Sequence, residues 1–318
     1  MKLLIELPTW MGDSVMATPA IENVLRYYNR PKVTLIGSFI STELLKKSLN
    51  QEQAIVLNKK SFNLYKTAKN LGEFDVFISF RSSFRSKLIK LFVTSKNKYQ
   101  FDKKKYTEGH VVEKYNNFIN DSLGVNSFPG KLLLQADKKS ICRKNKKIVG
   151  INPGASYGSA KRWYPEDFAY VATNLSSQYD IIIFGGKEEI DIAADIERHL
   201  IENSVRNYQN LVAKTSISEL ISQIASLDLF ITGDSGPMHL AAAFQVPTVA
   251  IFGPTNHKET SQWMNKKSII IKKDLECQPC MKRTCPLYHH NCMKLIDASE
   301  VLKAAQSFNL TSNAISIK

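Results

Sequence analysis

The chain has 318 residues, of which 43% are hydrophobic and 23% are charged, a composition typical of a globular protein with room for two domains. Its 43 lysines and arginines outnumber 29 acidic residues, and the net charge of +14 favours an anionic partner such as a phosphorylated substrate or an acidic membrane face. A nucleic-acid partner is not expected, because the basic clusters lack the motifs of nucleic-acid-binding modules. No apolar run approaches the roughly 18 residues that span a bilayer, and Pro8 ends the first run too early for a secretory signal, so we expect a cytoplasmic protein.

Strand-like and helix-like segments alternate through the first half of the chain. The apolar runs predict strands at 3–7, 31–37, 54–57 and 74–79. The segments between them predict helices at 14–28, 40–48 and 63–71. Strands that alternate with helices are typical of βαβ units and a parallel sheet.

The same pattern starts again after the lysine-rich segment 138–147. It predicts strands at 147–153, 179–186, 227–232 and 247–253. Helices are predicted from Pro165, at 217–226, from about Pro237 and at 299–306. We therefore predict an α/β protein with two domains, residues 1–145 including the basic linker and residues 146–318, in which the last helix could pack back on the first domain.

Two loops that join a strand to a helix carry most of the functional information. They are Thr9-Trp10-Met11-Gly12-Asp13-Ser14 and Thr232-Gly233-Asp234-Ser235-Gly236-Pro237-Met238-His239. Such a turn presents backbone N–H groups and the positive end of a helix dipole, which suits a phosphate. Because open parallel sheets bind ligands at the carboxyl ends of their strands, the two loops suggest two halves that face each other across a cleft.

The second of these loops is a candidate diphosphate site. Its glycines let the backbone approach a ligand closely, and Ser235 adds a hydroxyl donor. The alternative is an ordinary helix N-cap, since Asp and Ser are strong caps. In the first loop, Asp13 could accept a proton from an attacking hydroxyl, although a lone aspartate at a helix start is usually a cap.

Residues 152–163 form a third loop that is rich in small residues and ends in two cations and an aromatic ring. Ser156 can donate to a phosphate, and Lys161 can neutralise one. The alternative is a flexible loop with ordinary surface cations. Arg81, Arg85 and Lys87 follow another strand and suit an anionic acceptor, or equally form a basic helix face.

Four of the five cysteines lie within sixteen residues, in the spacing Cys277-x2-Cys280-x4-Cys285-x6-Cys292. In a cytosolic chain this spacing favours metal or redox chemistry over structural disulfides. A tetrahedral zinc site is one interpretation. Reduced, packed thiols are the other, and we prefer them because the second pair is spaced too widely for a zinc knuckle. Cys142 stands apart and is predicted to be buried.

Taken together, these motifs resemble those of the bacterial heptosyltransferases of lipopolysaccharide inner-core synthesis, glycosyltransferase family 9. The similar stretches are Leu7–Pro19, Asn152–Pro165 and Thr232–Pro254, and the segment Cys277–Cys292 is similar to that of the enzyme that adds the second heptose. The resemblance implies a GT-B fold, with ADP-heptose bound by the C-terminal half and heptose-bearing Kdo-lipid A, at the cytoplasmic face of the inner membrane, by the N-terminal half. It also implies an inverting transfer that needs no metal or other cofactor.

The resemblance also implies roles for single residues. Asp13 matches the general base of the family, and Lys161 its phosphate-binding lysine. The region of Ser235, Gly236, Met238 and His239 matches the diphosphate loop. Glu188 lies where the family often places an acidic residue near the nucleotide ribose, with a register uncertain by one residue.

Three other functions stay open at this point. The chain could add the first heptose, to bare Kdo-lipid A, in place of the second. It could be a GT-B transferase that uses a UDP- or GDP-sugar. Outside enzymes, it could be a nucleotide-binding module, in which Asp13→Ala would remove no activity.

Overall fold

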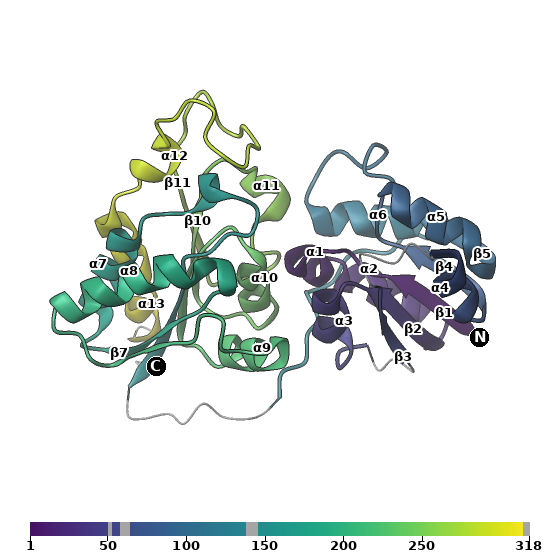
Figure 1. Cartoon of the computed structure of the whole chain (residues 1–318), viewed down its shortest axis with the longest axis horizontal. Coiled ribbons are helices and arrows are strands. Elements are labelled where there is room, and N and C mark those ends of the chain that lie inside the picture. Colours follow the sequence, from purple (N-terminus) through teal and green to yellow (C-terminus); the bar gives the residue numbers. More distant parts are fainter. Residues whose placement is uncertain (50–52, 58–63, 138–145, 314–318) are drawn as a thin grey trace. The chain divides into compact units, whose positions relative to one another are not determined.

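The computed structural model describes residues 1–49, 53–57, 64–137 and 146–313 (Figure 1). The chain divides into two compact units, Met1–Gln135 and Ala136–Lys318. The second unit begins earlier than the boundary predicted at 145, and residues 138–145, with Cys142, lie outside the described part. Among the described residues, we find no helix with the length and apolarity to span a bilayer.

The first unit contains a five-stranded sheet in the order β3-β2-β1-β4-β5, in which all paired neighbours run parallel. Its strands are β1 Lys2–Glu6, β2 Lys32–Gly37, β3 Gln53–Val56, β4 Glu73–Ser79 and β5 Thr94–Gln100. The central strands β1 and β4 are almost entirely buried. This order is that of a Rossmann-like half, as predicted.

The helices of the first unit are α1 Met11–Met16, α2 Thr18–Tyr27, α3 Phe39–Leu45, α4 Leu64–Asn70, α5 Phe84–Phe92 and α6 Val111–Leu123. The single helix predicted at 14–28 is in fact two helices that meet at Ala17. Pro19 has no N–H for the Val15 carbonyl, and the Thr18 hydroxyl donates to that carbonyl at 2.7 Å. The break leaves α1 as a short helix of its own, directly after β1.

The second unit contains a six-stranded sheet in the order β11-β10-β9-β6-β7-β8, again with parallel neighbours. Its strands are β6 Lys147–Asn152, β7 Tyr179–Ile183, β8 Tyr208–Asn210, β9 Leu229–Gly233, β10 Thr248–Phe252 and β11 Ser268–Lys272. The predicted α/β class with two Rossmann-like halves is therefore confirmed. The strand predicted at 247–253 is not the last one, because β11 adds an edge to the sheet.

The helices of the second unit are α7 Pro165–Leu175, α8 Ile190–Glu202, α9 Ile217–Ala225, α10 Gly236–Ala243, α11 His257–Thr260, α12 Asn291–Lys294 and α13 Ala298–Asn313. Two 3-10 turns, η1 Ser159–Lys161 and η2 Lys187–Glu189, follow β6 and β7. Helix α13 packs against α7, β10 and β11 of the second unit. That it also returns to the first unit stays a prediction.

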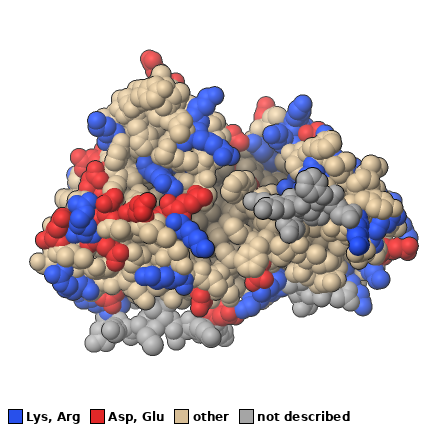
Figure 2. Space-filling view, viewed as in Figure 1, with Lys and Arg blue, Asp and Glu red and all other residues tan. Residues whose placement is uncertain are grey.

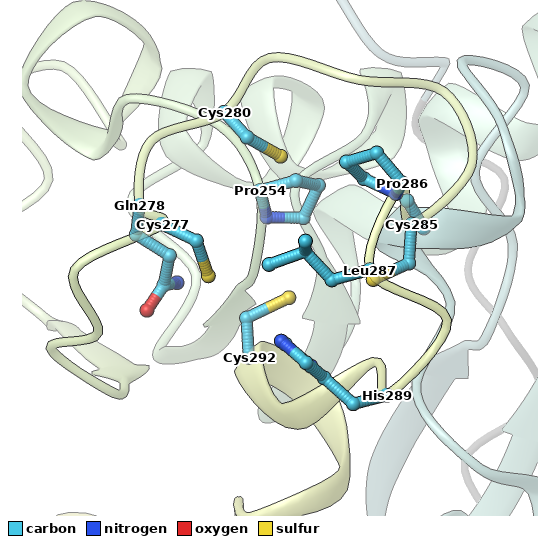
Figure 3. A pocket seen from close by; sticks show the side chains of 10 residues that line it. Pro254, Cys277, Gln278, Cys280, Cys285, Pro286, Leu287, His289 and Cys292 are labelled. Atoms are coloured by element: carbon cyan, nitrogen blue, oxygen red, sulfur yellow. The ribbon is translucent and has the colours of Figure 1, made fainter.

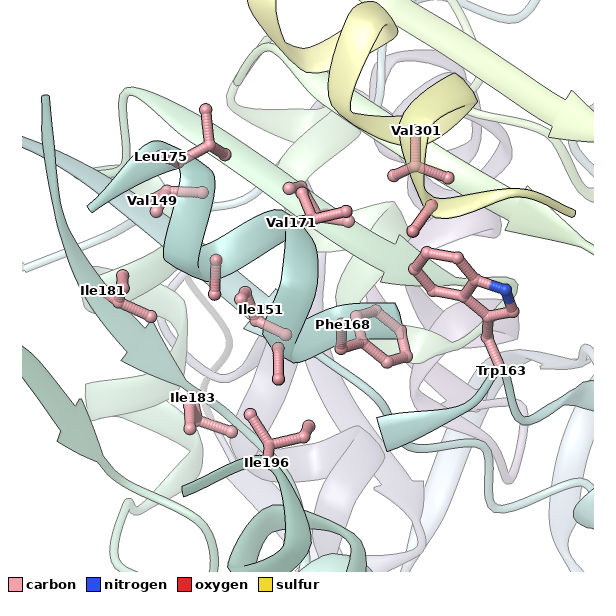
Figure 4. Close-up of a cluster of buried hydrophobic side chains, with 14 of the residues drawn as sticks. Val149, Ile151, Trp163, Phe168, Val171, Leu175, Ile181, Ile183, Ile196 and Val301 are labelled. Atoms are coloured by element: carbon pink, nitrogen blue, oxygen red, sulfur yellow. The ribbon is translucent and has the colours of Figure 1, made fainter. Parts of the chain in front are cut away.

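A large apolar core fixes the loop that follows β6 (Figure 4). Trp163, at the end of this loop, is 2% exposed, packs edge-to-face on Phe168 at 4.9 Å, and donates its indole N–H to the carbonyl of Ile296 at 3.2 Å. Lys161 lies two residues before this anchor. The core therefore holds one end of the loop that carries the predicted phosphate-binding lysine.

In both sheets the order in which strands are added reverses next to the first strand, and we expect the candidate site at this switch point. The chain winds outward through β2 and β3, then returns to pair β4 with the other edge of β1; β6 and β9 repeat the arrangement. Ligands of doubly wound sheets bind at the carboxyl ends of strands at such switch points. The charged surface in Figure 2 does not add a further candidate, because Lys and Arg are dispersed over it.

Candidate functional site

An ion pair links the two predicted donor loops at the switch point of the second sheet. Lys161 Nζ lies 2.5 Å from Asp234 Oδ2, and the two side chains are only 9% and 5% exposed. Lys161 ends the turn after β6, and Asp234 follows β9, the strand paired with β6. The structure therefore brings together two residues that the sequence predicted separately, and a buried carboxylate holds the lysine in position.

Neighbouring side chains orient this pair. The Thr255 hydroxyl donates to Asp234 Oδ2 at 2.6 Å. Asn152, at the end of β6, donates its amide to the hydroxyls of Ser235 at 3.0 Å and Thr232 at 3.2 Å. Ser235 is the N-cap residue of α10, but its side chain makes no capping hydrogen bond. The simple N-cap alternative thus fails for Ser235, whose hydroxyl belongs to the network between β6 and β9.

The other predicted donor residues have mixed positions. Ser156 and Glu188 are exposed and accessible to a ligand. Glu189, by contrast, is 5% exposed and accepts the Gly186 N–H at 2.8 Å, so it is a structural residue of the η2 turn. Glu188 therefore remains the acidic candidate for this position.

Gly236 and the two residues predicted after it begin α10. Met238 is fully buried against Ala250 and Phe252, and its N–H donates to the carbonyl of Ser235 at 3.1 Å. His239 is 3% exposed. The Met238 side chain is thus part of the core, and the match of this region to a diphosphate loop stays a prediction.

The switch point of the first sheet holds Asp13, in the first turn of α1 and partly exposed. Burial raises the pKa of Tyr115 well above its usual value, and the charge of Asp13 adds to this effect. The Asp13 carboxylate therefore lies close enough to α6 to influence the Tyr115 hydroxyl. Asp13 occupies the carboxyl end of β1, where a base could meet a bound hydroxyl.

A carboxylate that the sequence did not single out lies next to Arg81, one of the three cations (Arg81, Arg85 and Lys87) predicted to bind the acceptor. Glu6 is fully buried and accepts hydrogen bonds from Ser79 Oγ at 2.6 Å and Ser86 Oγ at 2.8 Å. Arg81 Nη1 lies 3.5 Å from Oε1, the same oxygen that accepts from Ser86. Burial raises the pKa of Glu6, while the two serine hydroxyls, Arg81 and Arg85 oppose the rise. The only sequence signal for Glu6 was an acid inside an otherwise apolar strand.

The remaining cations of this cluster divide between a loop and a helix. Arg81 precedes α5, whereas Arg85 and Lys87 lie on it. Lys87 is exposed and Arg85 is partly exposed. The structure thus shows Arg81 held next to Glu6, whereas Arg85 and Lys87 form part of a basic face of α5.

The four clustered cysteines line one pocket together with Leu287 and His289 (Figure 3). All four are free thiols, and burial raises the pKa of Cys292 to about 11. Within the described residues, no group of three or more His, Cys, Asp or Glu side chains is arranged to hold a metal ion. The zinc site and the reduced, packed interpretation therefore both stay predictions.

Known proteins are similar to this chain along almost all of its length. The chain is 46% identical, over 99% of both chains, to lipooligosaccharide heptosyltransferase 2 of Campylobacter jejuni serotype O:2. A second such protein, from C. jejuni serotype O:6, is 43% identical over 95% of this chain and 98% of its own length. The fold matches the solved structure of E. coli ADP-heptose lps heptosyltransferase II with a TM-score of 0.81 at 23% identity, over 98% of this chain and 100% of that one. Residues 64–290 match the model of the family, and the chain belongs to glycosyltransferase family 9 (heptosyltransferase).

Proposed function

We propose that this glycosyltransferase moves L-glycero-D-manno-heptose from ADP-heptose to the first heptose of Kdo-lipid A, in the synthesis of the lipooligosaccharide or lipopolysaccharide inner core. The observation that carries the proposal is the 46% identity, over 99% of both chains, with a protein named lipooligosaccharide heptosyltransferase 2. The pair Lys161–Asp234 at the second switch point supports the donor half of it.

In the proposed reaction, the diphosphate of the donor binds at the N-terminus of α10 beside Lys161. Negative charge grows on the diphosphate as the glycosidic bond breaks. Fixed donors and a helix N-terminus stabilise such charge without reorganisation in the transition state. Asp234 and Thr255 contribute by holding Lys161 in place, and Ser156 and Glu188 are proposed further contacts to the donor.

Asp13 is the proposed general base. It takes the proton from an acceptor hydroxyl, whose oxygen then attacks the anomeric carbon from the face opposite ADP, so that the configuration inverts. Arg81, with Arg85 and Lys87 nearby, is proposed to meet the anionic groups of the acceptor. The first unit is therefore proposed to bind the acceptor and the second unit the donor.

The acceptor is a lipid, so we also propose that the enzyme works at the cytoplasmic face of the inner membrane as a peripheral protein. The net charge of +14 supports this location, because anionic lipids attract basic surfaces.

The proposal is tested by incubating the purified enzyme with ADP-heptose and heptose-bearing Kdo-lipid A and measuring the product mass. We expect a gain of one heptose residue. Gain only on bare Kdo-lipid A would assign the first transfer instead, and gain only with a UDP- or GDP-sugar would change the donor. Binding of ADP without transfer to any of these acceptors would leave only a nucleotide-binding module.

A further inference from the structure

The segment from Leu275 to Cys292, here called the cysteine segment, packs on the loop that carries Lys161. The Ala160 N–H donates to the carbonyl of Arg283 at 3.0 Å, and the Tyr157 hydroxyl donates to the carbonyl of Met281 at 2.7 Å. On the other side of the turn, His290 Nε2 lies 2.9 Å from the Ala160 carbonyl. Three contacts therefore fix the short stretch between Tyr157 and Lys161.

Gly158 shows how closely the two segments fit. Its φ is +157°, and a Cβ built on it would lie 2.3 Å from the backbone carbonyl oxygen of Arg283. Any side chain here would have to displace backbone, because the obstacle is not the flexible end of a side chain. The position of Arg283 is thus set by the same turn that positions Lys161.

The cysteine segment is also attached to the loop after β10. The Met281 N–H donates to the Pro254 carbonyl at 2.9 Å, and the Gln278 amide donates to the Gly253 carbonyl at 2.6 Å. Ala160, in the loop after β6, and Pro254, in the loop after β10, both line the thiol pocket, and Figure 3 labels Pro254 there. The cysteine segment therefore connects the loops after β6 and β10, and its thiols line the pocket next to both loops.

Two cations, one buried and ion-paired and the other exposed, lie near the ring of Tyr157. Lys161 Nζ lies 5.2 Å from the ring centroid, and Arg283 Cζ lies 5.4 Å from it. Lys161 is buried and paired with Asp234. Arg283 is exposed, and none of the ion pairs recorded for the described residues involves it. The ring thus holds one neutralised cation and one uncompensated cation close to the same loop.

The charge of a nucleoside diphosphate is larger than Lys161 and the start of α10 can neutralise, so a second cation such as Arg283 is needed. Lys161 and Asp234 together carry no net charge, and the N-terminus of a helix such as α10 supplies only about half a positive charge. A nucleoside diphosphate brings between two and three negative charges, roughly, at neutral pH. A guanidinium is well suited to meet it, because its planar fork binds phosphate oxygens in pairs and stacks on aromatic rings.

We propose that Arg283 is a donor-binding residue, a second cation that contacts the phosphates of the nucleoside diphosphate, and that the cysteine segment positions it through Tyr157 and Gly158. This inference rests on the proposed function, whose donor it deepens. It gives the cysteine-rich motif a role that requires no metal ion.

The test measures the affinity of the full-length enzyme for ADP and for adenosine by titration calorimetry, with no acceptor present. Arg283→Ala should weaken ADP binding by about tenfold and leave adenosine binding unchanged, as expected for loss of a charge-assisted hydrogen bond. Arg283→Lys should recover part of the affinity. The matched control is Lys282→Ala, which removes the neighbouring exposed cation and should not change either affinity.

A second pair of variants separates contact from folding. Tyr157→Phe keeps the ring and loses only the bond to Met281, so it should bind ADP more tightly than Tyr157→Leu. Thermal unfolding of each variant identifies any loss of fold. Equal ADP affinity of Arg283→Ala and Lys282→Ala, in an enzyme that transfers heptose, would overturn the role of Arg283 alone. A wild-type enzyme that binds no ADP would remove the donor proposed above, and the role of Arg283 with it.

Discussion

Each unit places a carboxylate and a cation at the switch point of its sheet, but the two pairs are built differently. In the second unit, Lys161 and Asp234 are 2.5 Å apart and both nearly buried. In the first unit, Glu6 is fully buried and satisfied by two serine hydroxyls, while Arg81 is 19% exposed and 3.5 Å away. The lysine is therefore fixed by Asp234. Arg81 can move away from Glu6, because the two serine hydroxyls still hydrogen-bond that carboxylate.

This difference fits the ligands that we propose for the two units. A nucleoside diphosphate is a small ligand of constant shape, and a fixed lysine binds it at low entropic cost. A lipid-linked saccharide is larger and more variable, and an arginine that can move adapts to it. We therefore expect the second unit to determine the affinity for the donor, and the first unit to determine the rate of transfer.

Asp13→Asn gives the largest expected effect and tests this division directly. Loss of a general base should slow heptose transfer by about 10²–10⁴-fold, with unchanged affinity for ADP. The rate is measured by product mass at saturating substrates, and the affinity by calorimetry. Glu73→Gln is the control, because it removes an exposed carboxylate at the start of β4, the opposite end of the same sheet.

A wild-type rate in Asp13→Asn would assign the base to another residue. A parallel loss of ADP affinity would place Asp13 in the donor site and end the comparison between the units.

Asp234→Ala should destabilise the second unit, because it leaves Lys161 buried without its partner. We expect the free energy of unfolding to fall by about 3 kcal/mol, together with weaker ADP binding. Urea denaturation measures the first quantity. The double variant Lys161→Met with Asp234→Leu should recover stability but not ADP binding.

The exposed pair of Arg198 and Glu202, 3.7 Å apart on α8, is the control for this experiment. Arg198→Ala should not change stability measurably, since surface pairs contribute little. If Asp234→Ala also left the free energy of unfolding unchanged, the stability of the second unit would not depend on the ion pair with Lys161.

Gly158→Ala should have an intermediate effect. The left-handed side of backbone space and the contact with Arg283 predict a loss of about 1–3 kcal/mol in stability or a shifted loop. Thermal unfolding and ADP titration together measure this loss. Gly130→Ala is the matched control in the first unit, where nothing lies within 4 Å of the added carbon. Similar results for the two glycines would contradict the close fit of the cysteine segment.

Glu6→Gln should give the smallest effect, visible as a change in pH dependence. Because burial raises the pKa of Glu6 above 4.5, the folded state binds the proton more tightly than the unfolded chain. The resulting stability is present below pH 4.5 and is lost as pH rises through the raised pKa. The wild type should therefore lose stability relative to Glu6→Gln over this interval, as measured by urea denaturation at several pH values.

Asp167, whose pKa burial raises to about 6, titrates in a similar range in both proteins, so the difference between them isolates Glu6. A constant difference between the two proteins across this range would show that Glu6 has the same pKa in the folded and unfolded chain.

Local patterns predicted much of the fold and part of the site. The start of α7 at Pro165 follows from the fixed φ of proline and its missing N–H. The strands β1, β6 and β9 are buried on both faces, so they are visible as apolar runs. β5, a polar edge strand, gave no such signal, and α5 and α6 were not predicted.

The sequence by itself determined the alternation of strands and helices, the loops at strand ends, and the residue types that could serve as base or phosphate ligand, because these depend on neighbours in the chain. Only the tertiary structure decided that Asp234 holds Lys161, that Glu6 lies beneath Arg81, that Met238 belongs to the core, and that the cysteine segment packs on the Lys161 loop. Each of these depends on which strands pair and how their loops meet, and side chains far apart in sequence become partners only when the sheet has formed.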